Sequence, residues 1–321
     1  MLTPPVRAVP DSQDATRNIN RVGGDESEVP LKEVERDIAA NRFQQSKTLL
    51  SAYLKDHPDS AKAHYDLGYV QFRTHNTGAS IKELSKSLEL NPANAEGHKI
   101  LALDCSIIGR YDLAEVELQE AARLKPESGE IHYFLARTYY TRGVYPLAKS
   151  EFQTAIRLDP SSVKAYSNLG ITMEALGDSA EALKNYTRAI ELEDQQKHRS
   201  EWPYIYLSAF YNRQKNADGA LSYARKAIEL NPHSDTAYFE MAKAYRTQKQ
   251  LQKSADAARR AIAINAQVPD YYYVLGLVLR ELGEQKESTA ALAKYAQLQR
   301  PSGDTLPEHA EQEPLAAPEP Q

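Results

Sequence analysis

The feature that most constrains this chain is a repeat of 34 residues. Prolines recur with this spacing at Pro58, Pro92, Pro126 and Pro160. The same frame continues toward the C-terminus, with one longer step of 38 residues between Asp194 and Pro232. A fixed period of this length is typical of repeat proteins, in which each structural unit packs only against its neighbours.

The residues within one repeat follow a helical pattern. We number each repeat from the third residue after the preceding anchor, so that Ala61 is position 1 of the second repeat. Positions 4, 7, 8 and 11 form one stripe of a first helix, and positions 20, 24, 27 and 28 form a stripe of a second helix. Position 20 is always small: Ser46, Ser80, Ala114, Ala148, Ala182, Ala220, Ser254 and Ser288. Glycine occupies position 15, where the chain must reverse, at Gly109, Gly143, Gly177 and Gly283.

Each repeat is therefore predicted to be an antiparallel helix pair. One pair cannot bury its apolar stripe alone, so neighbouring pairs must stack. Small residues at positions 8, 20 and 27 let the helices approach closely, and a larger side chain there would cost roughly 1–3 kcal/mol. The expected fold class is all-α, a solenoid of stacked helix pairs.

This pattern resembles the tetratricopeptide repeat (TPR) family. The fullest matches are HYDLGYV at 64–70, YSNLGITMEALGD at 166–178 and YYVLGLVLRELGE at 272–284. The resemblance covers about residues 27–302, or eight repeats. It implies a right-handed superhelical solenoid, in which the first helices of the repeats line a concave groove.

The repeats and their flanks give the expected organisation of the chain. Residues 1–28 and the acidic, proline-rich tail at 301–321 lack apolar periodicity and are predicted to be disordered. Repeats 1–5 are expected at 29–194 and repeats 6–8 at 201–300. Altered core positions in the first and last repeats indicate capping, and self-association through these terminal repeats is left open.

A four-residue insertion separates the two groups of repeats, at 195–200. It is expected to be either one extra helical turn or a longer loop, and to be the place where the stack bends. Ser200 is the expected N-cap of the next helix, with Pro203 in its first turn.

Composition and motifs exclude several functional classes. Cys105 is the only cysteine, which excludes an internal disulfide and a multi-cysteine metal site. The sequence contains no run of 18 apolar residues, no phosphate-binding glycine loop, no HExxH and no nucleophile elbow. We therefore expect no membrane span, no cofactor, no small-molecule substrate and no catalysis. The cytoplasm is the default location, and an export signal encoded upstream would make it the periplasm or the exterior.

Three histidines share position 4 of successive repeats: His64, His98 and His132. Later repeats have tyrosine at this position. Equivalent helices of stacked repeats lie about 10 Å apart, whereas the ligands of one zinc ion lie about 2 Å from it. The histidines are therefore predicted to be packing residues and not a metal site.

The candidate ligand-binding residues lie at positions 5, 9 and 12, which face the groove in the family. From the second repeat onward, seven of these 21 positions are aromatic, five are Lys or Arg, and only Glu174 is acidic. With three neighbouring residues added, the predicted groove set is Tyr65, Tyr69, Phe72, Lys99, Tyr133, Arg137, Tyr140, Trp202, Tyr206, Arg213, Phe239, Lys243, Arg246, Tyr273 and Arg280. The alternative is that the position 5 aromatics pad neighbouring helices.

Rigid aromatic rings beside cations are typical of surfaces that bind peptides. The predicted function is a non-catalytic protein-interaction scaffold or adaptor that binds an extended segment with apolar and acidic groups. One alternative is an RNA-binding solenoid, which the charge of only about +2 on residues 29–300 disfavours. Another is an envelope or secretion assembly factor. The acidic tail itself is a further candidate occupant of the groove.

Overall fold

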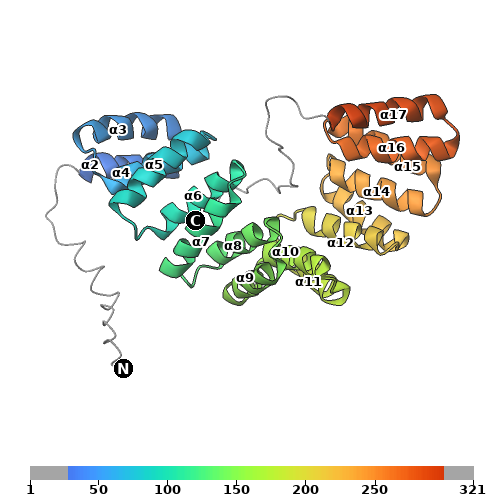
Figure 1. Cartoon of the computed structure of the whole chain (residues 1–321), viewed down its shortest axis with the longest axis horizontal. Coiled ribbons are helices and arrows are strands. Elements are labelled where there is room, and N and C mark those ends of the chain that lie inside the picture. The colour runs from blue at the N-terminus through green and yellow to red at the C-terminus, as the bar shows by residue number, and fades with distance from the viewer. Residues whose placement is uncertain (1–27, 300–321) are drawn as a thin grey trace, which may run out of the picture. The chain divides into compact units, whose positions relative to one another are not determined.

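The computed structural model describes residues 28–299, and every regular element in that range is a helix (Figure 1). The sixteen helices are α2 (Glu28–Ala39), α3 (Phe43–Asp56), α4 (Ala61–Arg73), α5 (Thr77–Leu90), α6 (Ala95–Ile107), α7 (Tyr111–Leu124), α8 (Gly129–Thr141), α9 (Tyr145–Leu158), α10 (Val163–Ala175), α11 (Ser179–Glu193), α12 (Trp202–Arg213), α13 (Ala217–Leu230), α14 (Asp235–Thr247), α15 (Leu251–Ile264), α16 (Pro269–Leu282) and α17 (Gln285–Leu298). The predictions for 1–27 and for the tail at 301–321 lie outside the described residues.

Consecutive helices form pairs, one pair for each repeat, so the predicted all-α class is confirmed. The chain divides into two compact units, one ending at Leu124 and one beginning at Lys125. In the first unit, α2 to α7 pack in sequence order, each helix against the next. In the second unit, α8 to α17 pack in the same way. The four-residue insertion lies inside the second unit, between α11 and α12.

Each repeat reverses at position 15 through a residue in the left-handed region. Gly109, Gly143, Gly177 and Gly283 have φ angles of 74°, 75°, 82° and 82°. The repeats without glycine use the same conformation, at Asn41, His75, Lys215 and Lys249, with φ angles of 56° to 61°. The turn is therefore imposed by the helix pair, and glycine only lowers its cost.

The two helices of a repeat meet at positions 8 and 20, as predicted, and the side chain at position 24 of the apolar stripe packs against position 8. A Cβ atom added to Gly68, Gly170 or Gly276 would lie 2.6–2.7 Å from the side chain at position 24 of the same repeat. In three repeats the buried hydroxyl of a serine at position 20 donates to the carbonyl at position 8, from Ser80 to Gly68, from Ser254 to Ala242 and from Ser288 to Gly276, at 2.7–2.9 Å. Backbone atoms of the two helices thus approach closely enough for a side-chain hydrogen bond between them.

The first helices also have their own start signal. The side chains of Ser60, Asn94, Ser128, Ser162 and Ser234 each accept a hydrogen bond from the backbone N–H three residues later. These caps satisfy donors that the helix itself leaves unpaired.

The insertion forms a loop and not an extra helical turn. The N-cap of α12 is Glu201 and not Ser200, so that expectation is wrong. The Ser200 backbone N–H donates instead to the carboxylate of Glu193, and its hydroxyl accepts from the Trp202 N–H at 3.3 Å. The Ser200 hydroxyl thus still accepts from one of the N–H groups that α12 itself leaves unpaired, although Ser200 lies one residue before the N-cap. Pro203 lies in the first turn of α12, as predicted.

Candidate functional site

The predicted groove residues of the first unit lie on α4 and α6, and they are partly covered. Tyr65, Tyr69 and Phe72 are half-buried, and burial raises the pKa of Tyr65. The Arg73 guanidinium donates to the Tyr69 hydroxyl at 2.7 Å and lies over the rings of Tyr69 and Phe43. The guanidinium of Arg73 is therefore held by the Tyr69 hydroxyl and by two aromatic rings.

Two predicted groove residues are buried. Lys99 is 9% exposed and forms an ion pair with Glu96 at 2.7 Å. Tyr133 is 8% exposed, its ring contacts Phe152, and its hydroxyl accepts from the Asn168 amide at 3.4 Å. Tyr133 therefore joins α8 to α9 and α10, and Lys99 is covered and paired within α6. The position of a residue in the repeat does not distinguish these roles from ligand binding.

Arg137 and Tyr140 lie next to Tyr133 on α8. The Arg137 guanidinium lies 5.7 Å from the centre of the Tyr133 ring, an arrangement that stabilises a cation. Tyr140 is half-buried, and its ring contacts Tyr145 at 5.4 Å. No carboxylate pairs with Arg137 among residues 28–299, so its charge is available on this surface.

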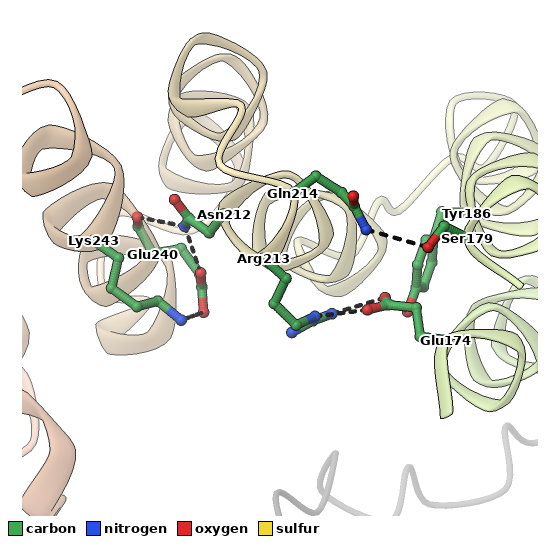
Figure 2. Close-up of polar contacts among 8 residues, drawn as sticks. All are labelled: Glu174, Ser179, Tyr186, Asn212, Arg213, Gln214, Glu240 and Lys243. Carbon is green, nitrogen blue, oxygen red and sulfur yellow. Dashed lines mark hydrogen bonds and ion pairs between the residues drawn. The ribbon is translucent and has the colours of Figure 1, made fainter. Parts of the chain in front are cut away.

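Arg213 is held by an ion pair that joins two repeats (Figure 2). Its guanidinium donates to both carboxylate oxygens of Glu174 on α10, at 2.6 and 2.8 Å. The hydroxyl of Tyr186, a fully buried residue, donates to the same carboxylate at 2.7 Å. Gln214 donates to the hydroxyl of Ser179 at 3.3 Å beside this pair. Glu174 is therefore a shared acceptor between α10, α11 and α12.

A second polar cluster joins α12 to α14 (Figure 2). The Asn212 amide donates to the backbone carbonyl of Glu240 at 2.9 Å and to its carboxylate at 2.7 Å. Lys243 forms an ion pair with the same carboxylate at 2.6 Å, and its ammonium lies 4.6 Å from the centre of the Phe239 ring. The cation that the sequence assigned to ligand binding is thus neutralised within the protein.

The last two repeats differ in whether the predicted arginine of the groove set is paired. Arg246 on α14 and Lys249 both bind Glu281 on α16, at 2.8 and 3.0 Å. Arg280 is exposed and has no partner within the described part of the chain. Tyr273, two turns earlier on the same stripe of α16, is 43% exposed and contacts the ring of Tyr295.

Trp202 and Tyr206 lie at the start of α12, next to the insertion. Both are half-buried, and their ring centres are 5.9 Å apart. They line a small cavity together with residues of α10 and of the loop.

The histidines at position 4 form the same contact three times. Each Nδ1 atom lies 2.6–2.7 Å from a glutamate Oε2 of the same repeat: His64 from Glu83, His98 from Glu117 and His132 from Glu151. Each Nε2 atom lies 2.9–3.0 Å from the carbonyl of the proline six residues earlier, which is Pro58, Pro92 or Pro126. Both ring nitrogens thus face acceptors, an arrangement that a doubly protonated imidazolium satisfies. We call these contacts the His–Glu clamps.

Electrostatics agree with this geometry for His98. Burial lowers its pKa, but the hydrogen bonds to Glu117 and to the Pro92 carbonyl outweigh burial and raise the pKa overall. The three histidines were predicted from the sequence to be packing residues, without their glutamate partners. The signal was present, because repeats 2–4 alone have glutamate at position 23. No group of three or more His, Cys, Asp or Glu residues within 28–299 is arranged to hold a metal ion.

None of the sixteen described helices combines the length and apolarity needed to traverse a bilayer.

No curated protein sequence matches the chain. Solved structures share its fold at low identity. A tetratricopeptide repeat protein from Parabacteroides merdae is 15% identical, with 79% of this chain and 98% of that chain covered and a TM-score of 0.65. The Cut9–Hcn1 structure of the APC/C is 14% identical, with 89% of this chain and 56% of that chain covered and a TM-score of 0.61. MamA from Desulfovibrio magneticus is 19% identical, with 55% of this chain and 99% of that chain covered and a TM-score of 0.51.

The family assignment rests on sequence profiles as well as on the fold. The profile described as "Tetratricopeptide repeat" matches residues 31–95, 169–235 and 207–269, and the one described as "TPR repeat" matches 136–177. Together with the helix pairs, the turn at position 15 and the close contact at position 8, these matches show that the chain belongs to the tetratricopeptide repeat family.

Proposed function

We propose that this protein is a non-catalytic adaptor that binds an extended segment of another protein along its first helices. Its membership of the TPR family supports a role as a protein-interaction scaffold. Within the described residues, stacking of the helix pairs accounts for most buried side chains, and the predicted groove set on the first helices combines aromatic rings with cations. We place the adaptor in the cytoplasm.

The distribution of paired charges narrows the chemistry of the ligand. Arg213, Lys243 and Arg246 already bind glutamates of neighbouring helices. A peptide carboxylate would have to displace those glutamates, which favours ligands with fewer acidic groups than the sequence suggested. Arg137 and Arg280 are the cations of the predicted set that have no such competitor. The expected ligand is therefore mainly apolar, with one or two acidic groups.

The observation that carries this proposal is the exposed cluster on the last repeat, made of Tyr273, Arg280 and Tyr295. Tyr273 is one of the few large apolar side chains that the structure leaves more than two-fifths exposed. The Tyr273 ring contacts the Tyr295 ring at 5.1 Å between centres and an inclination of 41°, and Arg280 lies two turns further along the same helix. Tyrosine and arginine side chains are enriched in interface hot spots. The cluster lies on α16 and α17, within the second unit.

The test begins with selection of short peptides from a random display library on the immobilised full chain. Binding of a selected peptide is then measured by fluorescence anisotropy for the wild type and for a Tyr273→Ser, Arg280→Ala double variant. We expect the variant to bind at least about tenfold more weakly, the loss of one hot spot. Leu147→Ser serves as a control, because Leu147 is 47% exposed on a second helix.

Two results would contradict the proposal. One is a selected peptide whose affinity is the same in wild type and double variant but falls in the Leu147→Ser control. The other is tighter binding of single-stranded RNA than of any peptide, with an affinity that falls steeply as salt is added, which would favour the nucleic-acid alternative.

A further inference from the structure

An open groove lies along the second helices of repeats 6 and 7, within the second unit. Its volume is about 640 Å³. It is bounded by α13 and by the segment where the chain turns from α14 into α15, and its walls include Leu221, Ser222, Arg225, Lys226, Tyr245 and Lys253. None of these residues belongs to the predicted groove set on the first helices. We call this feature the outer groove.

We propose that the outer groove binds the acidic tail at 301–321 of the same chain. The tail contains five acidic residues and no lysine or arginine. Three of the acids fall within a stretch of six residues: Glu308, Glu311 and Glu313. We call them the tail glutamates. This inference does not depend on the proposed function, because it assigns a different surface and a different ligand.

Two cations of the outer groove are open to a carboxylate. Arg225 is exposed and forms no hydrogen bond or ion pair among residues 28–299. Lys253 is also exposed, and its ammonium lies 5.7 Å from the centre of the Tyr245 ring. A contact with the face of a ring leaves the N–H groups that point away from it able to donate to a carboxylate. Both charges are therefore available to an acidic segment.

The predicted groove on the first helices differs in this respect. Three of its cations already form ion pairs with glutamates of the protein: Arg213, Lys243 and Arg246. The two without such a glutamate, Arg137 and Arg280, lie four repeats apart, whereas Arg225 and Lys253 line one groove. An acidic segment displaces no glutamate from the outer groove, so charge complementarity favours this surface.

Other charged groups at the outer groove act in both directions. Lys226 adds a third cation to the groove and interacts at longer range with Asp194, without an ion pair between them. Asp218 and Glu229 oppose an acidic ligand. Asp218 accepts a hydrogen bond from the Gln248 amide at 2.6 Å, and Glu229 is exposed without a partner in the described part of the chain. With three cations against two acids, the lining of the groove is positive overall.

Two hydroxyl groups add uncharged donors. The hydroxyls of Ser222 and Tyr245 form no hydrogen bond within the described helices, and neither is buried. A hydroxyl can donate to a carboxylate oxygen or to a backbone carbonyl. The groove can therefore bind the tail through hydroxyls as well as through cations.

The tail is long enough to reach the outer groove. The tail glutamates follow Gln299, the last described residue, by 9 to 14 positions, and an extended chain of this length spans about 30–50 Å. The groove helix α13 lies two repeats before α17. With helices about 10 Å apart and about 21 Å long, the groove is on the order of 30 Å from the end of α17. Because a tethered segment has an effective concentration of about 1 mM, a weak contact is populated.

The test uses the full chain and a carbodiimide, which joins a carboxylate directly to an amine that it contacts. Cross-linked peptides are identified by mass spectrometry, and the ion pair of Lys249 with Glu281, at 3.0 Å, is the internal standard for the reaction. We expect the tail glutamates to be joined to Lys226 or Lys253. Relative to the standard, this yield should fall severalfold from about 20 mM to about 0.5 M salt, because exposed charges are screened.

Two variants test the charge of the groove without removing a reactive lysine. Arg225→Gln removes a cation that the carbodiimide does not modify, and we expect the yield at Lys226 and Lys253 to fall about threefold. Glu229→Gln removes an opposing acid and should raise the yield. Arg157→Gln makes the same charge change at an exposed position of α9, outside the groove, and should leave the yield unchanged. The unfolding curve of each variant checks that the fold is kept.

Four results would overturn the proposal. One is cross-linking of the tail glutamates to Lys243 of the predicted groove, or evenly to all exposed lysines. A second is the absence of tail products when the internal standard forms, and a third is an unchanged yield in Arg225→Gln. The fourth is a mixture of unlabelled and isotope-labelled protein in which tail products join two different chains, which would assign the groove to a second copy. None of these results affects the peptide test at Tyr273 and Arg280, which uses another ligand and another readout.

Discussion

Repeats 2–4 and repeats 5–8 share one helix pair but place their charged side chains differently. In repeats 2–4, the histidine at position 4 binds the glutamate at position 23 of the same repeat. In repeats 5–8, tyrosine replaces that histidine, and ion pairs join the first helices of successive repeats through positions 12 and 13, as in Glu174–Arg213 and Arg246–Glu281. Charge thus strengthens single repeats in one region and the contact between repeats in the other.

This difference has a consequence for pH. The pKa of His98 is raised, so the His–Glu clamp of repeat 3 depends on pH, whereas Arg–Glu pairs keep both charges across the neutral range. We therefore expect repeat 3 to gain stability on mild acidification and repeats 5–8 to respond little.

The largest expected effect comes from Glu174→Ala, which breaks the connection between repeats 5 and 6. The substitution leaves the buried Tyr186 hydroxyl without its acceptor and the Arg213 guanidinium without its partner. We expect a loss of about 3 kcal/mol, mostly from the buried hydroxyl, because the side chain of Arg213 is 53% exposed. Hydrogen exchange of α10 to α12 amides measures the loss.

The matched control for this experiment is Glu181→Ala, which removes an exposed pair with Lys184. It should change hydrogen exchange by well under 1 kcal/mol. If both variants behave alike, the connection between repeats does not depend on Glu174, and the contrast between the two regions disappears.

An intermediate effect is expected from Asp104→Asn in repeat 3. Asp104 is fully buried, and burial raises its pKa from 3.8 to about 6, although the nearby Ser80 hydroxyl partly offsets this rise. A raised acid pKa means that the folded protein resists losing the proton, so stability falls as pH rises from about 4 through 6. Above pH 7 the variant should be more stable than wild type by about 2 kcal/mol, and near pH 4 the two should be equal.

The measurement is hydrogen exchange of α6 amides in both proteins, corrected for the intrinsic effect of pH. A stabilisation that is the same at pH 4 and pH 7.5 would show that the gain comes from packing and not from titration of Asp104.

The smallest loss of stability is expected from His98→Tyr. This substitution also tests most directly the difference between repeats 2–4 and repeats 5–8. This variant gives repeat 3 the position 4 residue of repeats 5–8. The His98 pKa is raised above its ordinary 6.5 by its two acceptors, so the clamp contributes fully below pH 6.5 and is lost as pH rises through the raised value. We expect the variant to lose about 1–2 kcal/mol at pH 6 and less at pH 9.

Glu117→Gln provides the second arm of this experiment, because it keeps an acceptor but removes the charge. It should show the same direction of pH dependence as His98→Tyr. The measurement is hydrogen exchange of the α6 and α7 amides. If the wild-type free energy of opening of these helices is the same at pH 6 and pH 9, the contact between His98 and Glu117 does not titrate in this range.

The fold was largely predictable from the sequence because its determinants are local and repeated. The period of 34 residues, the apolar stripes, the reversal at position 15 and the small residues at position 8 each recur, and each repetition confirms the others. The insertion was located but its conformation was not, since four residues fit one helical turn as well as they fit a loop. The loop is favoured because Glu193 binds the Ser200 N–H and Tyr204 binds Asp194.

The candidate site was predicted less well. Position in the repeat placed Tyr133 and Lys99 on the groove stripe, but burial depends on neighbouring helices, and these helices cover both. Position also identified Arg213, Lys243 and Arg246 as cations without revealing their glutamate partners, which lie 39, 3 and 35 residues away in the chain.

The sequence by itself determined the helix pairs, their number and the faces that they bury, because periodicity is a property of neighbouring residues along the chain. Only the tertiary structure decided which charges are available to a ligand and that histidines bind glutamates 19 residues away. These features depend on distances between helices, and a side chain has the same letter in the sequence whether its partner is a neighbouring helix or another molecule.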